Sequence, residues 1–483
     1  MNSARRSILI TLLSSNATVL IQFVASILIA RVLAPAEIGI YSIAAVLVGM
    51  AHLLRDLGTG NYLVREPELS EEKLRAVLGL MLAVSWLVGA LLALLSMPAA
   101  RFYREPQVAT VLQLLAFNML LIPFGSLTLS LLRRNLEAEK QAIAGIGSTL
   151  AHSVTAITLA MLGLGALSLA WASIAGTLVS ILIATAFRPA GLPWLPSWRG
   201  WRAPLNFGLL STGGAMLDEL NRGLYDLMLG RLINMRAVGL FSRAQGTVNL
   251  FYAVAGPAAY YTALPFFSRI HHRGAALDEP LLHAVRLLTG VALPFFGVLS
   301  GLAPLLIPVL YGHQWDESIA LVAPLCLAAA LNAPFALNGQ VYLALGHPRL
   351  VMLLAFGTVL IRAAGLYLIA GHGLIWVAFV PVAEQLLLIP VHLLLMQRVL
   401  GISARQVPAA AGPGLLLGLL LAGIAWIGTT LLQGRLPDLL LLALLGGLLG
   451  GLYLAGLRVL DHPLWPEIVQ LGQRLGINRT TRG

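Results

Sequence analysis

The chain has 483 residues, of which 58% are hydrophobic and only 11% are charged, and its mean hydropathy is +0.86. A soluble protein carries about 25% charged residues, so this composition excludes a water-soluble globular domain. The net charge of +11 does not indicate nucleic-acid binding, because the arginines alternate with apolar segments and form no cluster interleaved with aromatic residues. The composition predicts an all-α polytopic membrane protein.

Apolar segments long enough to cross the ~30 Å core of a bilayer recur along nearly the whole chain. We expect about 14 transmembrane helices, near residues 8–30, 36–54, 74–97, 108–130, 142–163, 166–187, 205–230, 237–268, 281–308, 316–338, 349–370, 374–397, 407–432 and 437–458. The eighth segment contains Pro257, and we expect it to kink or to end before Pro265.

The basic residues are distributed unequally between the two sides that these segments define. If the N-terminus is cytoplasmic, 21 of the 31 basic residues lie on the cytoplasmic side and six on the other side. Such an excess is typical of cytoplasmic loops, so both termini are predicted to be cytoplasmic. The single cysteine, Cys326, excludes an internal disulfide and a thiolate metal cage, and the scattered histidines predict no metal site.

The two halves of the chain share a pattern at an offset of 200 residues. The segment 31–44 aligns with 231–244 without a gap, with Arg, Gly, Ser and Ala identical in four places. An offset of six spans preserves orientation, so the pattern predicts two parallel six-helix repeats related by an axis along the membrane normal. The predicted parts are an N-terminal lobe (1–200), a C-terminal lobe (201–405), an additional transmembrane hairpin (406–458) and a cytoplasmic tail (459–483).

A polar stripe in the first span has a charged counterpart in the seventh. Thr11, Ser15, Thr18, Gln22 and Ser26 are spaced by three or four residues and therefore share one helix face. Adding 200 to the last three gives Asp218, Arg222 and Asp226, again on one face. We expect these two faces to line the transport path, since substrate paths commonly run between such repeats.

Ionisable residues inside a membrane are candidates for a functional site, because each costs about 2.5–3.5 kcal/mol on insertion scales. Arg222 has Asp218 and Asp226 at i−4 and i+4, where either carboxylate can pair with it. Arg243 and Arg286 lie within about two turns of span ends, where snorkelling to the interface is an equal alternative. Further charges, Arg362 and Glu384, lie in the eleventh and twelfth spans. Arginines in a cavity suit a diphosphate head group, which they bind in bidentate fashion.

The segments "ILIARVLAPAEIGIYSIA", "LLRDLGTGNYLVRE", "LLRRNLEAEKQAIAG", "LYGHQWDESIAL" and "YLALGHPRLV" resemble the Wzx-type polysaccharide flippases, in order and spacing, over essentially the whole chain. These belong to the multidrug/oligosaccharidyl-lipid/polysaccharide exporter superfamily. The resemblance implies MATE-like, V-shaped six-helix bundles that move undecaprenyl-diphosphate-linked oligosaccharides across the bacterial inner membrane. It also implies possible partners, namely a polysaccharide polymerase and co-polymerase and a coupling H⁺ or Na⁺, and no cofactor.

In the related lipid II flippases, cavity arginines end the first span and lie near the end of the second, and the matching positions here are Arg31 and Arg55. Helical phase places Arg31 opposite the polar stripe, and Asp56 follows Arg55 directly. The resulting candidate cavity set is Arg31, Arg55, Arg222, Asp218, Asp226, Gln22, Thr18, Ser26, Arg243 and Arg286.

Two other transport functions remain open on the sequence alone. A cation-coupled multidrug antiporter of the same superfamily is expected to have carboxylates inside its N-terminal bundle, and spans one to six show none that is clearly intramembrane. A lipid II flippase is compatible with the additional hairpin. An enzyme is disfavoured, because the longest loop on the outer side, around 97–107, is too short to hold a sugar and catalytic groups.

Overall fold

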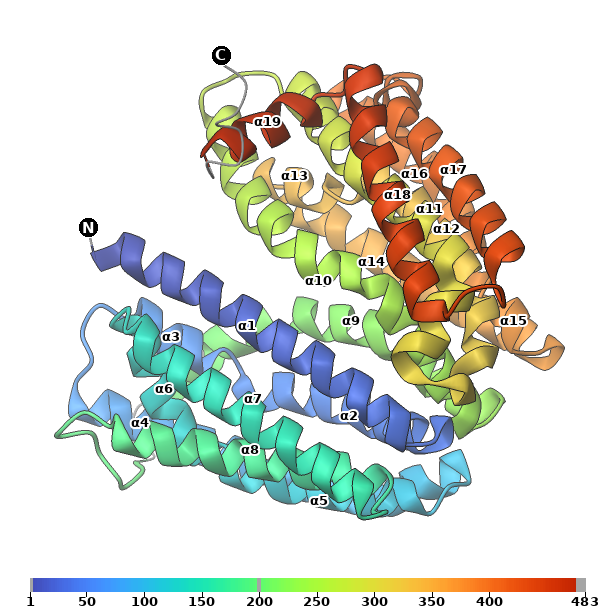
Figure 1. Cartoon of the computed structure of the whole chain (residues 1–483). Coiled ribbons are helices and arrows are strands. Elements are labelled where there is room, and N and C mark those ends of the chain that lie inside the picture. Colours follow the sequence, from blue (N-terminus) through green and yellow to red (C-terminus); the bar gives the residue numbers. More distant parts are fainter. Residues whose placement is uncertain (1–2, 198–200, 475–483) are drawn as a thin grey trace. The chain divides into compact units, whose positions relative to one another are not determined.

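A computed structural model describes residues 3–197 and 201–474, and these ranges contain nineteen α-helices, three short 3₁₀-helices and no β-strand (Figure 1). The predicted all-α class is confirmed. The chain forms two compact units, Met1–Ser242 and Arg243–Gly483, which are described separately below.

Unit 1 contains nine helices and the start of a tenth. Within it α1 packs along α7, α7 packs along α8, and α4 packs along α5. The helices are α1 (Ser3–Val32), α2 (Pro35–Asp56), α3 (Thr59–Arg65), α4 (Glu71–Tyr103), α5 (Gln107–Leu121), α6 (Pro123–Arg134), α7 (Ala138–Met161), α8 (Ala166–Ala186), α9 (Arg202–Leu232) and the first turns of α10 (Met235–His272).

Unit 2 is built around α11, which packs closely along α17 and also contacts α12 and α18. Its helices after α10 are α11 (Asp278–Tyr311), η1 (His313–Ser318), α12 (Ile319–Asn332), η2 (Ala333–Phe335), α13 (Asn338–Ala344), α14 (Pro348–Ile369), η3 (Ala370–His372), α15 (Leu374–Val377), α16 (Val380–Leu400), α17 (Gln406–Leu432), α18 (Asp438–Val459) and α19 (Leu464–Arg474). Cys326 is buried in α12, as predicted.

Local sequence sets where α2 begins and ends. Pro35 occupies the first helical turn, where its missing N–H costs no hydrogen bond, and the Glu37 carboxylate accepts a 2.8 Å hydrogen bond from the Ala34 N–H. The helix ends where Leu57 and Gly58 adopt left-handed conformations, with φ of 34° and 62°. These ends direct α2 into the short helix α3 and place Arg55 in the last turn.

Two predicted spans differ from the structure. The segment predicted as one span at 108–130 is a bent pair, α5 and α6, with an angle of 55° at the break before Pro123. Proline lacks the N–H that would continue the helix, which explains the bend. Of the two alternatives for the eighth span, an end before Pro265 is wrong, because α10 continues to His272. A kink in this helix stays a prediction. Proline inside a membrane helix is tolerated where neighbouring groups satisfy the freed carbonyls.

The described residues contain 11 helices long and apolar enough to cross a membrane, or 12 if α5 and α6 form one span. These match twelve of the fourteen predicted segments, and the exact count of 14 is not confirmed. The two segments without a match correspond to α9 and α10. They are long enough to span a bilayer, but they carry the charged residues of the second repeat.

The predicted lobes follow the sequence repeat, whereas the compact units follow spatial packing. Because α9 packs along α2, it belongs with the first unit, although the repeat assigns it to the second. The repeat boundary at 200 therefore remains a prediction, and residues 198–200 lie outside the described ranges, as do residues 475–483 of the predicted tail.

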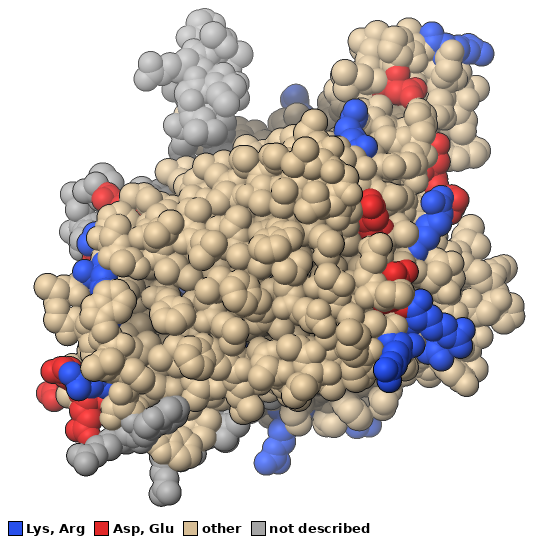
Figure 2. All heavy atoms as spheres, turned by 90° about the horizontal axis from the view of Figure 1, so that it is seen from below, with Lys and Arg blue, Asp and Glu red and all other residues tan. Residues whose placement is uncertain are grey.

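The outer surface of unit 1 agrees with a membrane location. Figure 2 shows a broad face without charged side chains, bordered at two opposite ends by Lys, Arg, Asp and Glu. Exposed large side chains on α4 include Trp86, Leu87, Leu91, Leu94 and Leu95. An apolar face of this extent exceeds what a soluble monomer exposes, so it contacts lipid. The protein is a multi-pass membrane protein.

The repeat brings equivalent residues of α2 and α10 together inside unit 1. A Cβ atom added to Gly39 would overlap the carbonyl oxygen of Met235, and one added to Gly239 would overlap that of Pro35. The Ser42 and Ser242 hydroxyls lie 3.4 Å apart. Each contact therefore has its counterpart 200 residues away, as around a local two-fold axis. The gapless match at 31–44 and 231–244 includes this meeting point.

Candidate functional site

Small residues let α2 and α9 approach closely in unit 1. A Cβ on Gly223 would overlap the side chain of Val46, and a Cβ on Gly49 would overlap the Glu219 carboxylate. Close helix packing of this kind is common in membranes. The hydrophobic effect does not drive helices together in lipid, and small residues allow the close van der Waals contact that does. We call the contact between these helices the α2–α9 seam. It holds the Glu219 carboxylate against the backbone of α2.

The central charge pair of the seam is Arg222 with Glu219. Arg222 donates from Nη2 to Glu219 Oε2 at 2.7 Å and from Nε to the same oxygen at 3.3 Å. The expected partners, Asp218 and Asp226, do not form this pair, and Glu219 at i−3 forms it instead. The Arg222 side chain is 68% exposed and that of Glu219 is 23% exposed. Glu219 therefore holds one edge of the Arg222 guanidinium, and the rest of the group remains accessible.

Arg55 lies at the end of α2, near the same seam. Its Nη2 pairs with Asp56 Oδ1, and its side chain is only 12% exposed. The second guanidinium nitrogen, Nη1, is buried and has no hydrogen-bond partner among the described residues. His52, one turn earlier, is within electrostatic reach of Arg55, Asp56 and Glu219. The sequence interpretation did not select His52, although the spacing 52, 55, 56 at the end of a span was a usable signal, and it counted Glu219 among the charges of the seventh span without naming it as the partner of Arg222.

The two aspartates predicted to share one face of α9, Asp218 and Asp226, differ in burial. Asp218 is exposed, whereas Asp226 is half-buried, and its Oδ1 is buried without a hydrogen-bond partner among the described residues. Two steps of four residues rotate a helix position by about 80°, which explains the change of environment. Tyr103 at the end of α4 lies within electrostatic reach of Asp226.

The polar stripe of α1 divides similarly. Gln22 is exposed. Ser26 is half-buried and donates to the Phe23 carbonyl at 2.8 Å. Thr18 is half-buried and faces a pocket formed with α6, α7 and α8. Arg31 is exposed in the last turn of α1. The three stripe residues Thr18, Gln22 and Ser26 share one predicted face but have three different surroundings.

Two candidate arginines belong to unit 2. Arg243 stacks against the rings of Tyr311 and Trp315, with its guanidinium carbon 4.6 and 5.0 Å from the ring centroids. Such cation–π contacts stabilise a partly desolvated guanidinium. Arg286 is half-buried on α11 and forms no ion pair with another described residue. The environment of Arg243 is that of a packed residue, whereas Arg286 keeps its donors available.

Unit 2 also contains a buried ion pair between α14 and α16. Arg362 donates from Nε to Glu384 Oε2 at 2.8 Å and from Nη2 to Oε1 at 2.9 Å. The Glu384 side chain is 1% exposed and that of Arg362 is 15% exposed. Bidentate geometry of this kind is strong and directional. The pair joins two helices, and both groups are already satisfied.

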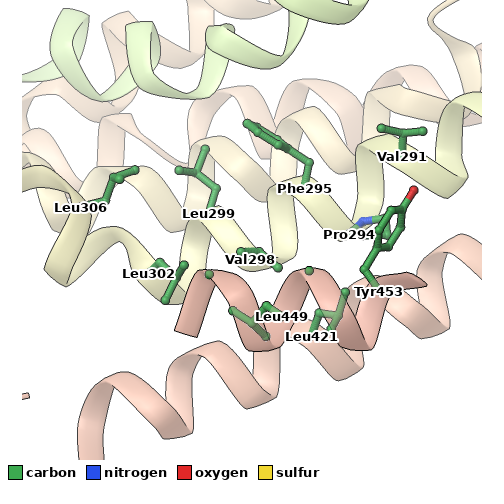
Figure 3. A pocket seen from close by; sticks show the side chains of 12 residues that line it. Val291, Pro294, Phe295, Val298, Leu299, Leu302, Leu306, Leu421, Leu449 and Tyr453 are labelled. Atoms are coloured by element: carbon green, nitrogen blue, oxygen red, sulfur yellow. The ribbon is translucent and has the colours of Figure 1, made fainter. Parts of the chain in front are cut away.

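An apolar pocket of about 380 Å³ lies between α11, α17 and α18 (Figure 3). Its wall consists of aliphatic and aromatic side chains from α11, including Phe295, Val298 and Leu302, together with Leu449 and Tyr453 of α18. The Tyr453 hydroxyl donates to the Gly290 carbonyl at 3.1 Å, so it does not offer a free polar group. A pocket of this composition suits a hydrocarbon chain. No group of three or more His, Cys, Asp or Glu side chains in the described part of the chain is placed to hold a metal ion.

A protein-family model described as "Polysaccharide biosynthesis protein" matches residues 28–320, which include α2, α9 and the repeat contact. The chain belongs to this family. Three curated relatives are similar to this chain. The teichuronic acid biosynthesis protein TuaB of Bacillus subtilis (strain 168) is 22% identical over 322 residues. The lipopolysaccharide biosynthesis protein WzxC of Escherichia coli (strain K12) is 24% identical over 314 residues, and the succinoglycan biosynthesis transport protein ExoT of Rhizobium meliloti (strain 1021) is 24% identical over 331 residues.

These matches cover 66%, 63% and 67% of this chain and 66%, 62% and 66% of the three relatives, so just under two thirds of each family member is aligned. Among solved structures, the lipid II flippase MurJ in an inward closed conformation matches with a TM-score of 0.73 and 12% identity, over 95% of this chain and all of that chain. An inward-facing MATE family multidrug transporter matches with a TM-score of 0.62 and 16% identity, over 84% and 95%. At these identities the likeness establishes the fold alone, and that fold is MATE-like.

Proposed function

We propose that this protein is a flippase and not an enzyme. It moves undecaprenyl-diphosphate-linked oligosaccharide repeat units from the cytoplasmic to the periplasmic leaflet of the bacterial inner membrane, for cell-surface polysaccharide biosynthesis. The names of the three relatives refer to teichuronic acid, lipopolysaccharide and succinoglycan, which supports a polysaccharide precursor as the substrate.

The observation that carries this proposal is the position of Arg222. It lies ten residues before the end of α9, about 15 Å along the helix, and its side chain is 68% exposed. An arginine exposed to lipid at that depth is costly, so its exposure favours a polar path along this face. Arg55 supplies a second guanidinium with an unused nitrogen near the same seam. Two guanidinium groups match the charge and geometry of a diphosphate.

The apolar pocket of α11, α17 and α18 supports a lipid-linked substrate. Its hydrocarbon lining matches an isoprenoid chain and does not match a sugar. We therefore propose that arginines of α2 and α9 recognise the diphosphate and that the prenyl chain stays in hydrocarbon surroundings. Alternating access of the cationic cavity then moves the head group across the membrane.

Replacing Arg55 or Arg222 with alanine tests the function. In a strain that lacks its own polysaccharide flippase, we expect each variant to restore about tenfold to a hundredfold less surface polysaccharide than the wild type, because a hydrogen bond to a charged group is worth about 1.5–3 kcal/mol. Lysine at either position will restore part of the activity, since it keeps the charge but not the bidentate geometry.

The matched control is Arg101→Ala, an exposed arginine in the last turn of α4 and outside the seam. Protein in the membrane fraction is quantified for every variant, so that export is compared at equal amounts. Normal export by both seam variants would refute a head-group role for these arginines.

We also propose that both termini of the chain lie on the cytoplasmic side of the inner membrane. A reporter that is active only in the periplasm, fused after Gly483, is expected to remain inactive, and a reporter active only in the cytoplasm is expected to be active, because the basic residues divide 21 to 6. Periplasmic activity would require an odd number of spans and would refute the fourteen-span topology.

A further inference from the structure

The helix α19, in unit 2, has apolar residues on one side and polar residues on the other. Four apolar side chains follow the spacing of a single helix face, namely Leu464, Trp465, Ile468 and Val469. Three polar side chains on the other face are exposed, namely Glu467, Gln470 and Gln473. With 11 residues the helix is about 16 Å long, too short for the ~30 Å core of a bilayer. This pattern is typical of a helix that lies on a surface.

A tight turn separates α19 from α18, which is long and apolar enough to span a membrane. Asp461 has a left-handed backbone with φ of 45°, and the His462 N–H donates to the Leu457 carbonyl at 2.9 Å. The Leu464 N–H then donates to His462 Nδ1 at 3.2 Å, which starts α19 in a new direction. Figure 1 shows α19 running across the direction of α18. A helix that crosses the end of a span in this way lies along the membrane surface.

Only the beginning of the apolar face of α19 packs on the protein. His462 is buried, and a Cβ atom added to Gly290 of α11 would overlap the His462 ring and the Leu464 side chain. Leu464 and Trp465 pack against the apolar core formed by α11, α17 and α18. Ile468, one turn further, is exposed. The apolar face therefore extends beyond its anchor on α11.

The surroundings of α19 indicate that lipid covers the exposed part of this face. Hydrocarbon and head groups meet at the end of the apolar span α18, where α19 begins. Trp465 lies in the first turn of α19, and tryptophan is enriched at this boundary of the membrane. After Glu467 the sequence has no acidic residue and three basic ones, Arg474, Arg479 and Arg482. Basic segments next to a span are attracted by anionic lipids, so the charge of the segment matches such a surface.

We propose that α19 is an interfacial helix that binds the anionic lipid surface of the membrane, with Ile468 inserted between the head groups and the acyl chains. The inference requires that α18 spans the membrane and does not depend on the transported substrate. Because His462 and Leu464 fix the start of α19 against Gly290, this contact also holds α11, the central helix of unit 2, at a set level relative to the membrane surface.

The test places a fluorescent dye on either face of α19 in the full chain, reconstituted in lipid nanodiscs. The buried Cys326 is replaced by alanine, and the dye is attached to the cysteine of Ile468→Cys or of the matched control Gln470→Cys. The two positions are about 200° apart around the helix. We expect a lipid with a nitroxide near its head group to quench the dye at position 468 at least about threefold more than at 470, and aqueous iodide to quench position 470 more. Replacing phosphatidylglycerol with phosphatidylcholine is expected to reduce the lipid quenching at 468.

Three results would contradict the proposal. Equal iodide quenching at both positions would place the apolar face in water. A dye at position 468 that neither quencher reaches would mean that protein, and not lipid, covers this face. Equal lipid quenching in both lipid compositions would refute the preference for an anionic surface. Both substitutions are at exposed positions, where effects on stability are small, and thermal unfolding verifies that each labelled protein is folded.

Discussion

Replacing Gly39 or Gly239 with alanine is expected to destabilise unit 1 by about 3 kcal/mol or more, at the upper end of the cost of overpacking. A methyl group at either position would overlap a backbone carbonyl oxygen, that of Met235 or that of Pro35. A backbone oxygen cannot rotate away as a side chain can, so α2 and α10 would have to separate. The measurements are the midpoint of thermal unfolding and the fraction of monodisperse protein in detergent.

The matched control is Gly246→Ala, seven residues after Gly239 on α10, where an added Cβ meets no atom within 4 Å. Alanine is a better helix former than glycine by about 1 kcal/mol, so this control is expected to be neutral or slightly stabilising. If the Gly39 and Gly239 variants unfold at the temperature of the control, α2 and α10 do not approach each other as described.

Removing one partner of the buried pair Arg362–Glu384 is expected to cost about 3–5 kcal/mol, because the other charge remains buried without its partner. Arg362→Met and Glu384→Leu should therefore each lower the free energy of unfolding strongly. The double variant should recover most of the loss, since replacing both charges by apolar groups is often neutral. Unfolding in denaturant, followed for all four proteins, gives the coupling energy directly.

A comparison with an exposed pair makes this prediction specific. Arg75 and Glu71 lie 2.6 Å apart at i and i+4, with 44% and 63% of their side chains exposed. Arg75→Met is expected to change stability by less than about 1 kcal/mol, as surface pairs usually do. Similar losses at both pairs would indicate that Glu384 is hydrated, contrary to its burial.

Some features of the site were accessible from spacing along one helix, and others were not. Helical spacing identified Arg222 as a charged residue on the face that carries Asp218, and a repeat of 200 residues identified the segments in which Gly39 and Gly239 meet. Spacing could not select Glu219 as the partner of Arg222, because the position of its carboxylate depends on Gly49 of another helix.

Residues distant in the sequence decide the surroundings of other candidates. Arg243 is enclosed by Tyr311 and Trp315, about seventy positions later, so its packing cannot be read from its own helix. The polar pocket lined by Thr18, Ser148 and Ser180 draws on four helices, α1, α6, α7 and α8, and of these only α1 showed a polar stripe in the sequence. Proline likewise had opposite effects at Pro123, where the helix breaks, and at Pro265, where it continues.

The sequence by itself determined the all-α membrane class, the apolar spans and the internal repeat, because hydrophobicity over about 20 residues and helical periodicity are properties of the chain alone. The tertiary structure decided which polar groups form hydrogen bonds or ion pairs within the protein and which stay available to solvent or a ligand. That distinction separates two adjacent arginines: Arg134 donates to the Leu63 carbonyl at 2.6 Å, whereas Arg133 is exposed. It depends on which carbonyl, carboxylate or ring is brought near by another helix, and helix–helix packing sets this over distances that no local pattern encodes.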